Sequence, residues 1–132
     1  MKDVEKYYKE TISAKPSKLL QKFWNMKLSE EIVPKTAIDL GCGAGNDTIF
    51  LLNQGFCVTA VDKERKVIDI IQNRLKDLSQ LNFLIEDFEK VELHKTNLIL
   101  ANLSLFFCEP KYFHIFMKKI INNINKNGYF IR

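Results

Sequence analysis

The residues with the clearest potential for binding chemistry follow one short apolar segment of the chain. The run from Asp39 to Asn46 reads DLGCGAGN and combines a carboxylate with glycines at positions 41, 43 and 45. Glycine lets the backbone turn tightly and lets a ligand approach it closely. Because similar turns also occur for packing alone, the glycines by themselves are weak evidence, and the elements around them decide their meaning.

Two further groups of polar residues end apolar segments in the same way. Asp62 follows the second segment, 21 residues beyond Gly41, where a carboxylate can accept both ribose hydroxyl hydrogens of a nucleoside. The alternative is that Asp62 only caps the next helix, and in this context we favour ribose binding. Glu86-Asp87-Phe88 follows the third segment. Asp87 could accept a hydrogen bond from an adenine amino group and Phe88 could pack on the base, although alone this is an ordinary strand-end turn.

The elements that must position these residues alternate along the chain. Apolar runs predict strands over 36–40, 56–61, 81–85, 97–101 and 128–131. Helical spacing predicts a helix opened by Pro16 and Ser17 and a helix from 46 or 47 to about 54, capped by Asn46 or Asp47. Further helices are predicted around 67–75, with Val67, Ile68, Ile71 and Leu75 on one face, and from Pro110 onward. Strands that are apolar on both faces and alternate with helices favour an α/β fold with a doubly wound, mainly parallel sheet.

Composition and charge exclude several classes of protein. A chain of 132 residues and 15.4 kDa, 46% hydrophobic and 27% charged, is typical of one globular domain. The net charge of +4 comes mostly from lysine, which favours a solvated surface over nucleic-acid binding. Cys42, Cys57 and Cys108 form no CxxC pair, so we expect packing residues, no metal site and a cytoplasmic location. No signal peptide is visible, and the longest apolar run, 98–108, is too short to span a membrane.

With these residues in place, the sequence resembles the class I S-adenosylmethionine-dependent methyltransferases over residues 36–131. The motif is Asp-x-Gly-x-Gly-x-Gly, whereas the dinucleotide fingerprint has its third glycine one position later, at Asn46 here. The spacing therefore favours S-adenosylmethionine over NAD as cofactor. Residues 101–107, ANLSLFF, are similar to the small-molecule branch, which includes tellurite-resistance and thiopurine-type enzymes. They lack the Asn-Pro-Pro-aromatic motif of enzymes that methylate base amines.

This resemblance implies a Rossmann-like sheet in the order 3-2-1-4-5 with helices on both faces. It also implies a helical lid over residues 1–34 and a cofactor domain over 35–132. The methionine part of the cofactor would face Asp39, Gly41, Cys42, Gly43 and Gly45. Asp62 would hold the ribose with Lys63 beside it, and Asp87 and the backbone of Phe88 would hold the adenine. Asn102 and Leu103 would line the sulfonium and the substrate mouth.

Three hypotheses about function follow. The first is a methyltransferase that acts on a small-molecule acceptor, the second a cofactor-binding module without activity of its own, and the third an NAD-dependent oxidoreductase. No catalytic residue is assigned, because no motif places His94 or His114 as a general base. The family sheet usually has seven strands and this sequence stops after the fifth. We therefore expect the exposed fifth strand to pair with another chain, most simply as a homodimer.

Overall fold

The computed structural model describes residues 4–87, 90–101 and 110–132, and five strands form its centre. They are β1 (Thr36–Leu40), β2 (Cys57–Asp62), β3 (Leu81–Ile85), β4 (Thr96–Leu100) and β5 (Ile124–Ile131). All neighbouring strands are parallel, in the order β3-β2-β1-β4-β5. The predicted α/β fold and strand order are therefore confirmed.

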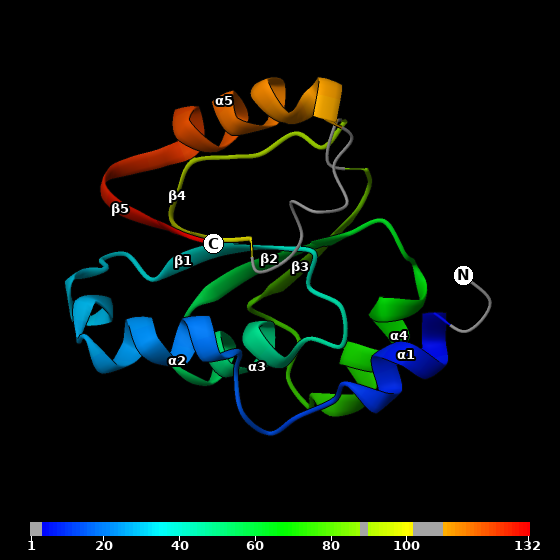
Figure 1. Ribbon diagram of the computed structural model, residues 1–132. Helices are drawn as coiled ribbons and strands as arrows, with labels where there is room; N and C mark the ends of the chain where they lie inside the picture. The colour runs from blue at the N-terminus through cyan, green and yellow to red at the C-terminus, as the bar shows by residue number, and fades with distance from the viewer. Residues whose placement is uncertain (1–3, 88–89, 102–109) are drawn as a thin grey trace.

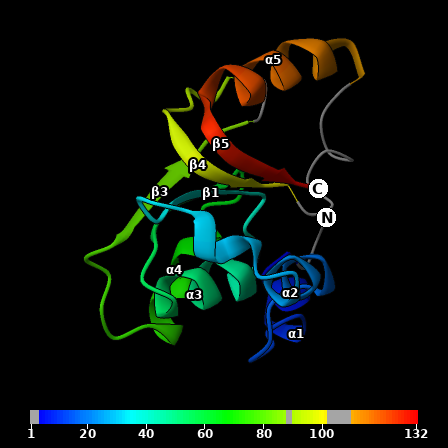
Figure 2. The ribbon, with the colours of Figure 1, turned by 90° about the vertical axis from the view of Figure 1, so that its left-hand side faces the viewer.

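Helices cover both faces of this sheet, as expected. One face carries α1 (Val4–Glu10), α2 (Lys18–Asn25), α3 (Asn46–Asn53) and α4 (Lys66–Arg74), and the other carries α5 (Phe113–Asn123) (Figure 1). The view from the side shows the three layers, with the sheet between α5 and the remaining helices (Figure 2). Among the described residues, the 3₁₀ segment η1 (Leu28–Glu31) follows α2, and the 3₁₀ segment η3 (Pro110–Tyr112) precedes α5.

The neighbouring strands β1 and β4 are almost fully buried because each contributes to two cores. Successive side chains of a strand point to opposite faces. Ala37 and its neighbour Leu98 accordingly join the cluster under α2 and α3, whereas Ile38 and Ile99 join the cluster under α5. All four are at most 2% exposed. Burial on both faces explains why these strands show no polar alternation in the sequence.

The N-terminal part of the chain contains two helices with different roles. Ser17 caps α2 as predicted, and Leu20 and Phe23 of α2 are buried in the core against the sheet. Trp24 meets Phe50 of α3 edge-on, with ring centroids 5.0 Å apart. The helix α2 is thus part of the layer that covers the sheet. The shorter α1 was not predicted, because the first 15 residues are polar and show no apolar period.

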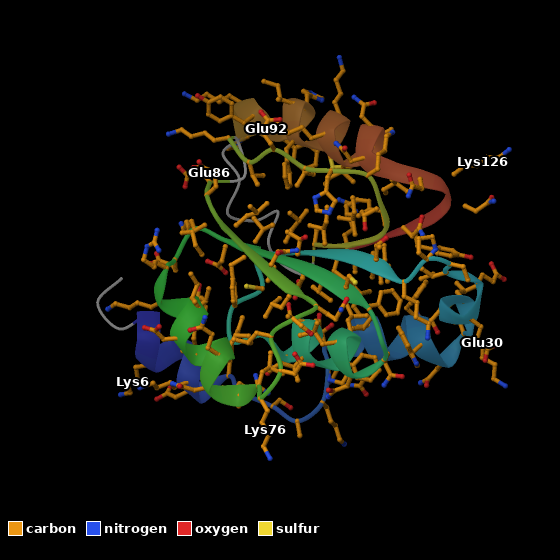
Figure 3. The ribbon with its side chains drawn as sticks, turned by 180° about the vertical axis from the view of Figure 1, so that it is seen from behind. Lys6, Glu30, Lys76, Glu86, Glu92 and Lys126 are labelled. Atoms are coloured by element: carbon orange, nitrogen blue, oxygen red, sulfur yellow. The ribbon has the colours of Figure 1, made fainter. Side chains whose placement is uncertain are left out.

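Most charged side chains lie on the outside of the molecule, apart from the buried Asp39, Asp47 and Asp62. Figure 3 shows this for the six labelled residues, all of which are exposed: Lys6, Glu30, Lys76, Glu86, Glu92 and Lys126. On α1, Nζ of Lys6 lies 3.9 Å from Oε1 of Glu10, and both side chains of this ion pair are exposed. None of the helices in the described ranges has both the length and the apolar character to cross a membrane.

The glycine turn between β1 and α3 is shaped by its contact with α4. Gly45 has a φ of +88°, a backbone angle that residues with a side chain rarely adopt. Its N–H donates to the carbonyl of Cys42 at 2.9 Å. A Cβ at this position would lie only 2.5 Å from Cγ1 of Ile71. Glycine is required here for close helix packing as well as for the turn.

We expect Gly45→Ala to destabilise the protein far more than Gly55→Ala. Gly55 has nearly the same φ, +89°, but a Cβ there would meet only Lys35, at 3.8 Å. The left-handed backbone should cost about 1–2 kcal/mol at both positions. The contact with Ile71 should add about 1–3 kcal/mol at position 45. Urea denaturation of the two variants measures the difference, and equal losses would show that Ile71 moves aside freely.

Candidate functional site

Several of the predicted residues meet where the strands end. The strand order reverses between β1 and β4, and open α/β sheets bind ligands at such a switch point, outside the carboxyl ends of the strands. The glycine turn, residues 41–45, leaves β1 at this place. Asp62 ends β2, and Asp87 lies two residues beyond Ile85, which pairs with Asp62 across β2 and β3. The topology thus gathers the three strand ends that the sequence singled out.

The backbone N–H groups of the glycine turn point toward the end of β2. Those of Gly41 and Cys42 donate to the carbonyl of Val61 at 2.7 and 3.0 Å. The N–H of Gly43 donates to Oδ2 of Asp62 at 3.0 Å. Since each of these three N–H groups already has a partner within the protein, this part of the turn is preformed and these donors are not available to a phosphate.

The side chain of Asp62 makes two bonds within the protein, one of them the cap-like bond that the sequence left open. Its Oδ1 accepts the N–H of Glu64 at 3.0 Å, just before α4 begins, which resembles a helix cap. Its Oδ2 holds Gly43 in the turn. Burial raises the pKa of Asp62, and the N–H groups of Glu64 and Gly43 act in the opposite direction. A carboxylate has about four acceptor positions, so ribose hydroxyls can still be accepted beside these two bonds.

Asp39 lies behind the turn and is only 4% exposed. The hydroxyl of Thr48 donates to its Oδ2 at 2.7 Å, and the backbone N–H of Thr48 also bonds to this carboxylate. Burial raises the pKa of Asp39 to about 7, and repulsion from Asp47 and Asp62 adds to the rise. The first turn of α3 is therefore occupied by a carboxylate of the protein itself.

Cys42 is a packing residue, as expected. It is 8% exposed and lies in a small cluster with Ala60, Val67 and Ile71. Burial raises the pKa of its thiol well above the usual range, and Asp39 and Asp62 contribute in the same direction. A neutral thiol of this kind fills space in the turn and is a poor nucleophile.

The prediction that Asn46 or Asp47 caps α3 is wrong. Gly45 occupies the cap position and makes no side-chain bond there. Asp47 instead accepts the N–H of Ser17 at 2.6 Å and its hydroxyl at 2.8 Å. Asn46 accepts the N–H of Ser13 and donates to the carbonyl of Thr11, both at 2.9 Å. These side chains hold residues 11–17, which we call the strap, against the start of α3.

Sequence reasoning missed Arg74, which lies beside the turn. Its guanidinium donates to the carbonyl of Ala44 and to Oδ1 of Asn46, both at 2.7 Å, and to the carbonyl of Ser13 at 2.8 Å. In the sequence Arg74 is the last residue of an amphipathic helix, a place where a basic residue is ordinary. No local pattern could have connected it with residues 13 and 44.

The remaining predicted residues are less closely tied to the turn. Lys63 and Asp87 are exposed, and the N–H of Asp87 donates to the side chain of Glu86 at 3.0 Å. Tyr8 of α1 covers the turn, because a Cβ at Gly43 would lie 3.5 Å from its ring. Three predicted site residues lie outside the described residues: Phe88, Asn102 and Leu103. The two histidines, at positions 94 and 114, are exposed.

An all-parallel sheet in this order, with a glycine turn after its first strand and a carboxylate after its second, defines the Rossmann-like fold of the class I S-adenosylmethionine-dependent methyltransferases. The chain belongs to the family of the tellurite resistance protein TehB, whose model matches residues 5–131. The resemblance inferred from the glycine motif is therefore confirmed, and with it S-adenosylmethionine as the cofactor of the class.

Individual relatives agree with this assignment. The carboxy-S-adenosyl-L-methionine synthase of Campylobacter concisus is 32% identical over 112 residues, which cover 81% of this chain and 48% of the relative. The solved structure of TehB from Haemophilus influenzae matches 80% of this chain and 37% of its own, with 19% identity and a TM-score of 0.65. The CcbJ methyltransferase from Streptomyces caelestis matches 93% of this chain and 52% of its own, with 14% identity and a TM-score of 0.72. The chain spans about half the length of the curated relatives it matches.

We expect Asp39→Asn to stabilise the protein at pH 8. The pKa of Asp39 is raised from 3.8 to about 7 in the folded chain, so the folded chain binds this proton more tightly than the unfolded chain. The contribution of Asp39 to stability is therefore complete below about pH 4 and is lost as the pH rises through about 7. Asparagine keeps an oxygen for Thr48 and carries no charge.

The free energy of unfolding, measured with urea between pH 4 and 8, checks this expectation. The variant should exceed the wild type most at pH 8, and the difference should shrink toward pH 4. Asp69→Asn on the exposed surface of α4 is the matched control and should change little at either pH. A variant that is less stable than the wild type at pH 8 would contradict the expectation.

Proposed function

We propose that this chain binds S-adenosylmethionine at the glycine turn and transfers its methyl group to a small-molecule acceptor. The observation that carries the proposal is the chemistry of the turn itself. The N–H groups of Gly41, Cys42 and Gly43 have partners inside the protein. The carboxylates of Asp47 and Asp62 lie close enough to raise the pKa of Asp39. Such a site favours a ligand with positive charge, and S-adenosylmethionine carries a sulfonium and an ammonium group.

The same observation argues against an NAD-dependent oxidoreductase. A dinucleotide places its pyrophosphate on free N–H groups at the start of the helix after the first strand. Here the N–H of Thr48 at the start of α3 bonds to Asp39, and that of Gly43 bonds to Asp62. The buried carboxylates of Asp39 and Asp62 would also repel a diphosphate. Electrostatics and the glycine spacing thus favour the same cofactor.

Within the proposal, each strand end has a role. The carboxylate of Asp62 accepts the ribose hydroxyls with Lys63 beside it, and Asp87 with the backbone of Phe88 holds the adenine. Asn102 and Leu103 line the sulfonium and the mouth of the site. Residues 4–17 provide the cover over the turn, since Tyr8 packs beside Gly43. The buried contacts of α2 make it part of the core layer rather than a moving lid.

Methyl transfer requires little from side chains beyond alignment. The cofactor supplies a methyl group on a sulfonium, and its departure leaves a neutral thioether. The chain would hold the acceptor in line with this group and exclude water, which together can provide most of the rate. The exposed positions of His94 and His114 give no support to either as a general base.

The names of the curated relatives favour a second candidate reaction. Relatives about 30% identical to this chain are named carboxy-S-adenosyl-L-methionine synthase. A chain with that activity would exchange a proton of the S-adenosylmethionine methyl group for a carboxyl group from a carboxylate donor that releases it as carbon dioxide, instead of forming S-adenosylhomocysteine. Mass spectrometry of the cofactor after incubation with cell extract depleted of other methyltransferases distinguishes the two products. A chain that binds cofactor and forms neither product would be a binding module.

We also propose that β5 pairs with another chain and that the protein is cytoplasmic. β5 lies at the edge of the described sheet and pairs with β4 alone among the described strands, which supports pairing with another chain there, such as a homodimer. A cytoplasmic location is consistent with the chemistry of the proposed cofactor and acceptor.

Cofactor choice is tested by thermal unfolding in the presence of ligands. A ligand that binds only the folded state raises the melting temperature. S-adenosylmethionine and S-adenosylhomocysteine should both raise it, whereas NAD at the same concentration should leave it unchanged. Stabilisation by NAD with none by either adenosyl compound would overturn the proposal.

Asp62→Ala tests the ribose role. Loss of hydrogen bonds to a charged group costs about 1.5–3 kcal/mol, so S-adenosylhomocysteine should bind roughly ten- to a hundredfold more weakly. Calorimetric titration measures the affinity, and Asp69→Ala on exposed α4 is the matched control with wild-type affinity expected. Unchanged affinity in a folded Asp62→Ala protein would leave Asp62 with its two structural bonds alone.

A further inference from the structure

The strap has no regular secondary structure, and side chains of α3 and α4 bond to several of its backbone groups. At Ser13, both the backbone N–H and the backbone carbonyl are bonded to such side chains. Its N–H donates to Oδ1 of Asn46 at 2.9 Å, and its carbonyl accepts from Arg74 at 2.8 Å. The carbonyl of Thr11 accepts from Nδ2 of Asn46 at 2.9 Å. The order of this segment therefore depends on the side chains of Asn46, Asp47 and Arg74, located 30 to 61 residues away along the sequence.

Arg74 is the member of this network that also touches the glycine turn. One terminal nitrogen donates to both Ala44 and Asn46, and the other donates to Ser13. Distances of 2.7–2.8 Å are typical of bonds from a charged donor. A guanidinium presents several donors in a rigid planar fork, whereas a lysine ammonium is a single point of charge. Lysine could reach one of these acceptors but not hold all three in place.

The acceptors belong to two parts of the proposed site. The carbonyl of Ala44 lies inside the glycine turn, and Ser13 lies in the strap that follows α1. Tyr8 of α1 packs beside Gly43 in the same turn. Docking of the strap thus fixes both the floor of the site, through Ala44, and its cover, through α1.

We propose that Arg74 is a positioning residue that couples the strap to the glycine turn, so that the cofactor binds tightly only when the strap is docked. This inference rests on the proposed function. If binding and docking are coupled, each must favour the other. Cofactor should therefore slow hydrogen exchange in the strap, and loss of the Arg74 bonds should weaken cofactor affinity.

The experiment combines two measurements on the full chain with S-adenosylhomocysteine as the probe. Calorimetry gives its affinity, and hydrogen exchange with mass spectrometry follows the peptide that contains residues 11–17, with and without the probe. The variants are Arg74→Gln and Arg74→Lys. Arg65→Gln is the matched control, because Arg65 is an exposed arginine next to the start of the same helix.

In the wild type and in Arg65→Gln, the probe should slow exchange in the strap. In both Arg74 variants we expect the affinity for the probe to fall about tenfold. The strap should exchange faster without the probe, and adding the probe should not slow it. A merely structural arginine would lower the melting temperature of the variants but leave the slowing caused by the probe intact. Folded Arg74 variants with wild-type affinity and wild-type slowing would overturn the proposal.

Asn46→Ala keeps the test decisive if the Arg74 variants fail to fold. It removes the bonds to Thr11, Ser13 and Arg74 and leaves those from Arg74 to Ala44 and to Ser13. Without the probe the strap should exchange faster than in the wild type, and the probe should still slow it through the bonds that Arg74 keeps. A folded Asn46→Ala protein that binds the probe with no slowing in the strap would overturn the coupling through Arg74. A wild-type chain that does not bind the probe at all would overturn the proposed function, and the coupling with it. Normal wild-type binding with unaffected variants would overturn the coupling alone.

Discussion

The carboxylate of Asp62 holds the glycine turn to the end of β2, and the rest of the site depends on this link. One oxygen accepts the N–H of Gly43 and the other accepts the N–H of Glu64. The first bond fixes the path from β1 into α3, and the second fixes the path from β2 into α4. Because α3 and α4 are set by the same side chain, Gly45 and Ile71 come close enough to exclude any Cβ at position 45.

A second consequence of this geometry is the sign of the local charge. Asp39 and Asp62 are both at most 5% exposed, and burial raises the pKa of each. Hydrogen bonds from Thr48, Gly43 and Glu64 offset part of that unfavourable burial, but they are dipoles and do not neutralise the carboxylates. Buried groups with shifted pKa values are more common at functional sites than elsewhere. Burying two carboxylates is unfavourable in a hydrophobic core, but it suits a site that binds a positively charged ligand.

The sequence predicted the parts of the fold and site that depend on local patterns. Apolar runs located all five strands, β1 and β3 to the residue, and the glycine spacing identified the class of protein. β5 begins at Ile124 rather than near residue 128, because Ile124 already pairs with Thr96, before a register shift that precedes the pair of Leu98 and Tyr129. Asn46 and Asp47 have the residue types of helix caps, but tertiary contacts with the strap outweighed that preference. Arg74 could not be predicted, since its partners lie 28 to 61 residues away.

The long separations within the strap network also affect how the chain reaches this structure during synthesis. The strap leaves the ribosome well before its partners, since the Asn46 bonds span 33 and 35 residues and the Arg74 bond to Ser13 spans 61. Until α4 has been translated, the carbonyl of Ser13 lacks the Arg74 guanidinium that bonds to it in the folded chain. Nascent domains fold as their interacting parts become available. The cover of the site is therefore made first and ordered late, after β1, α3, β2 and α4 have formed the surface that receives it.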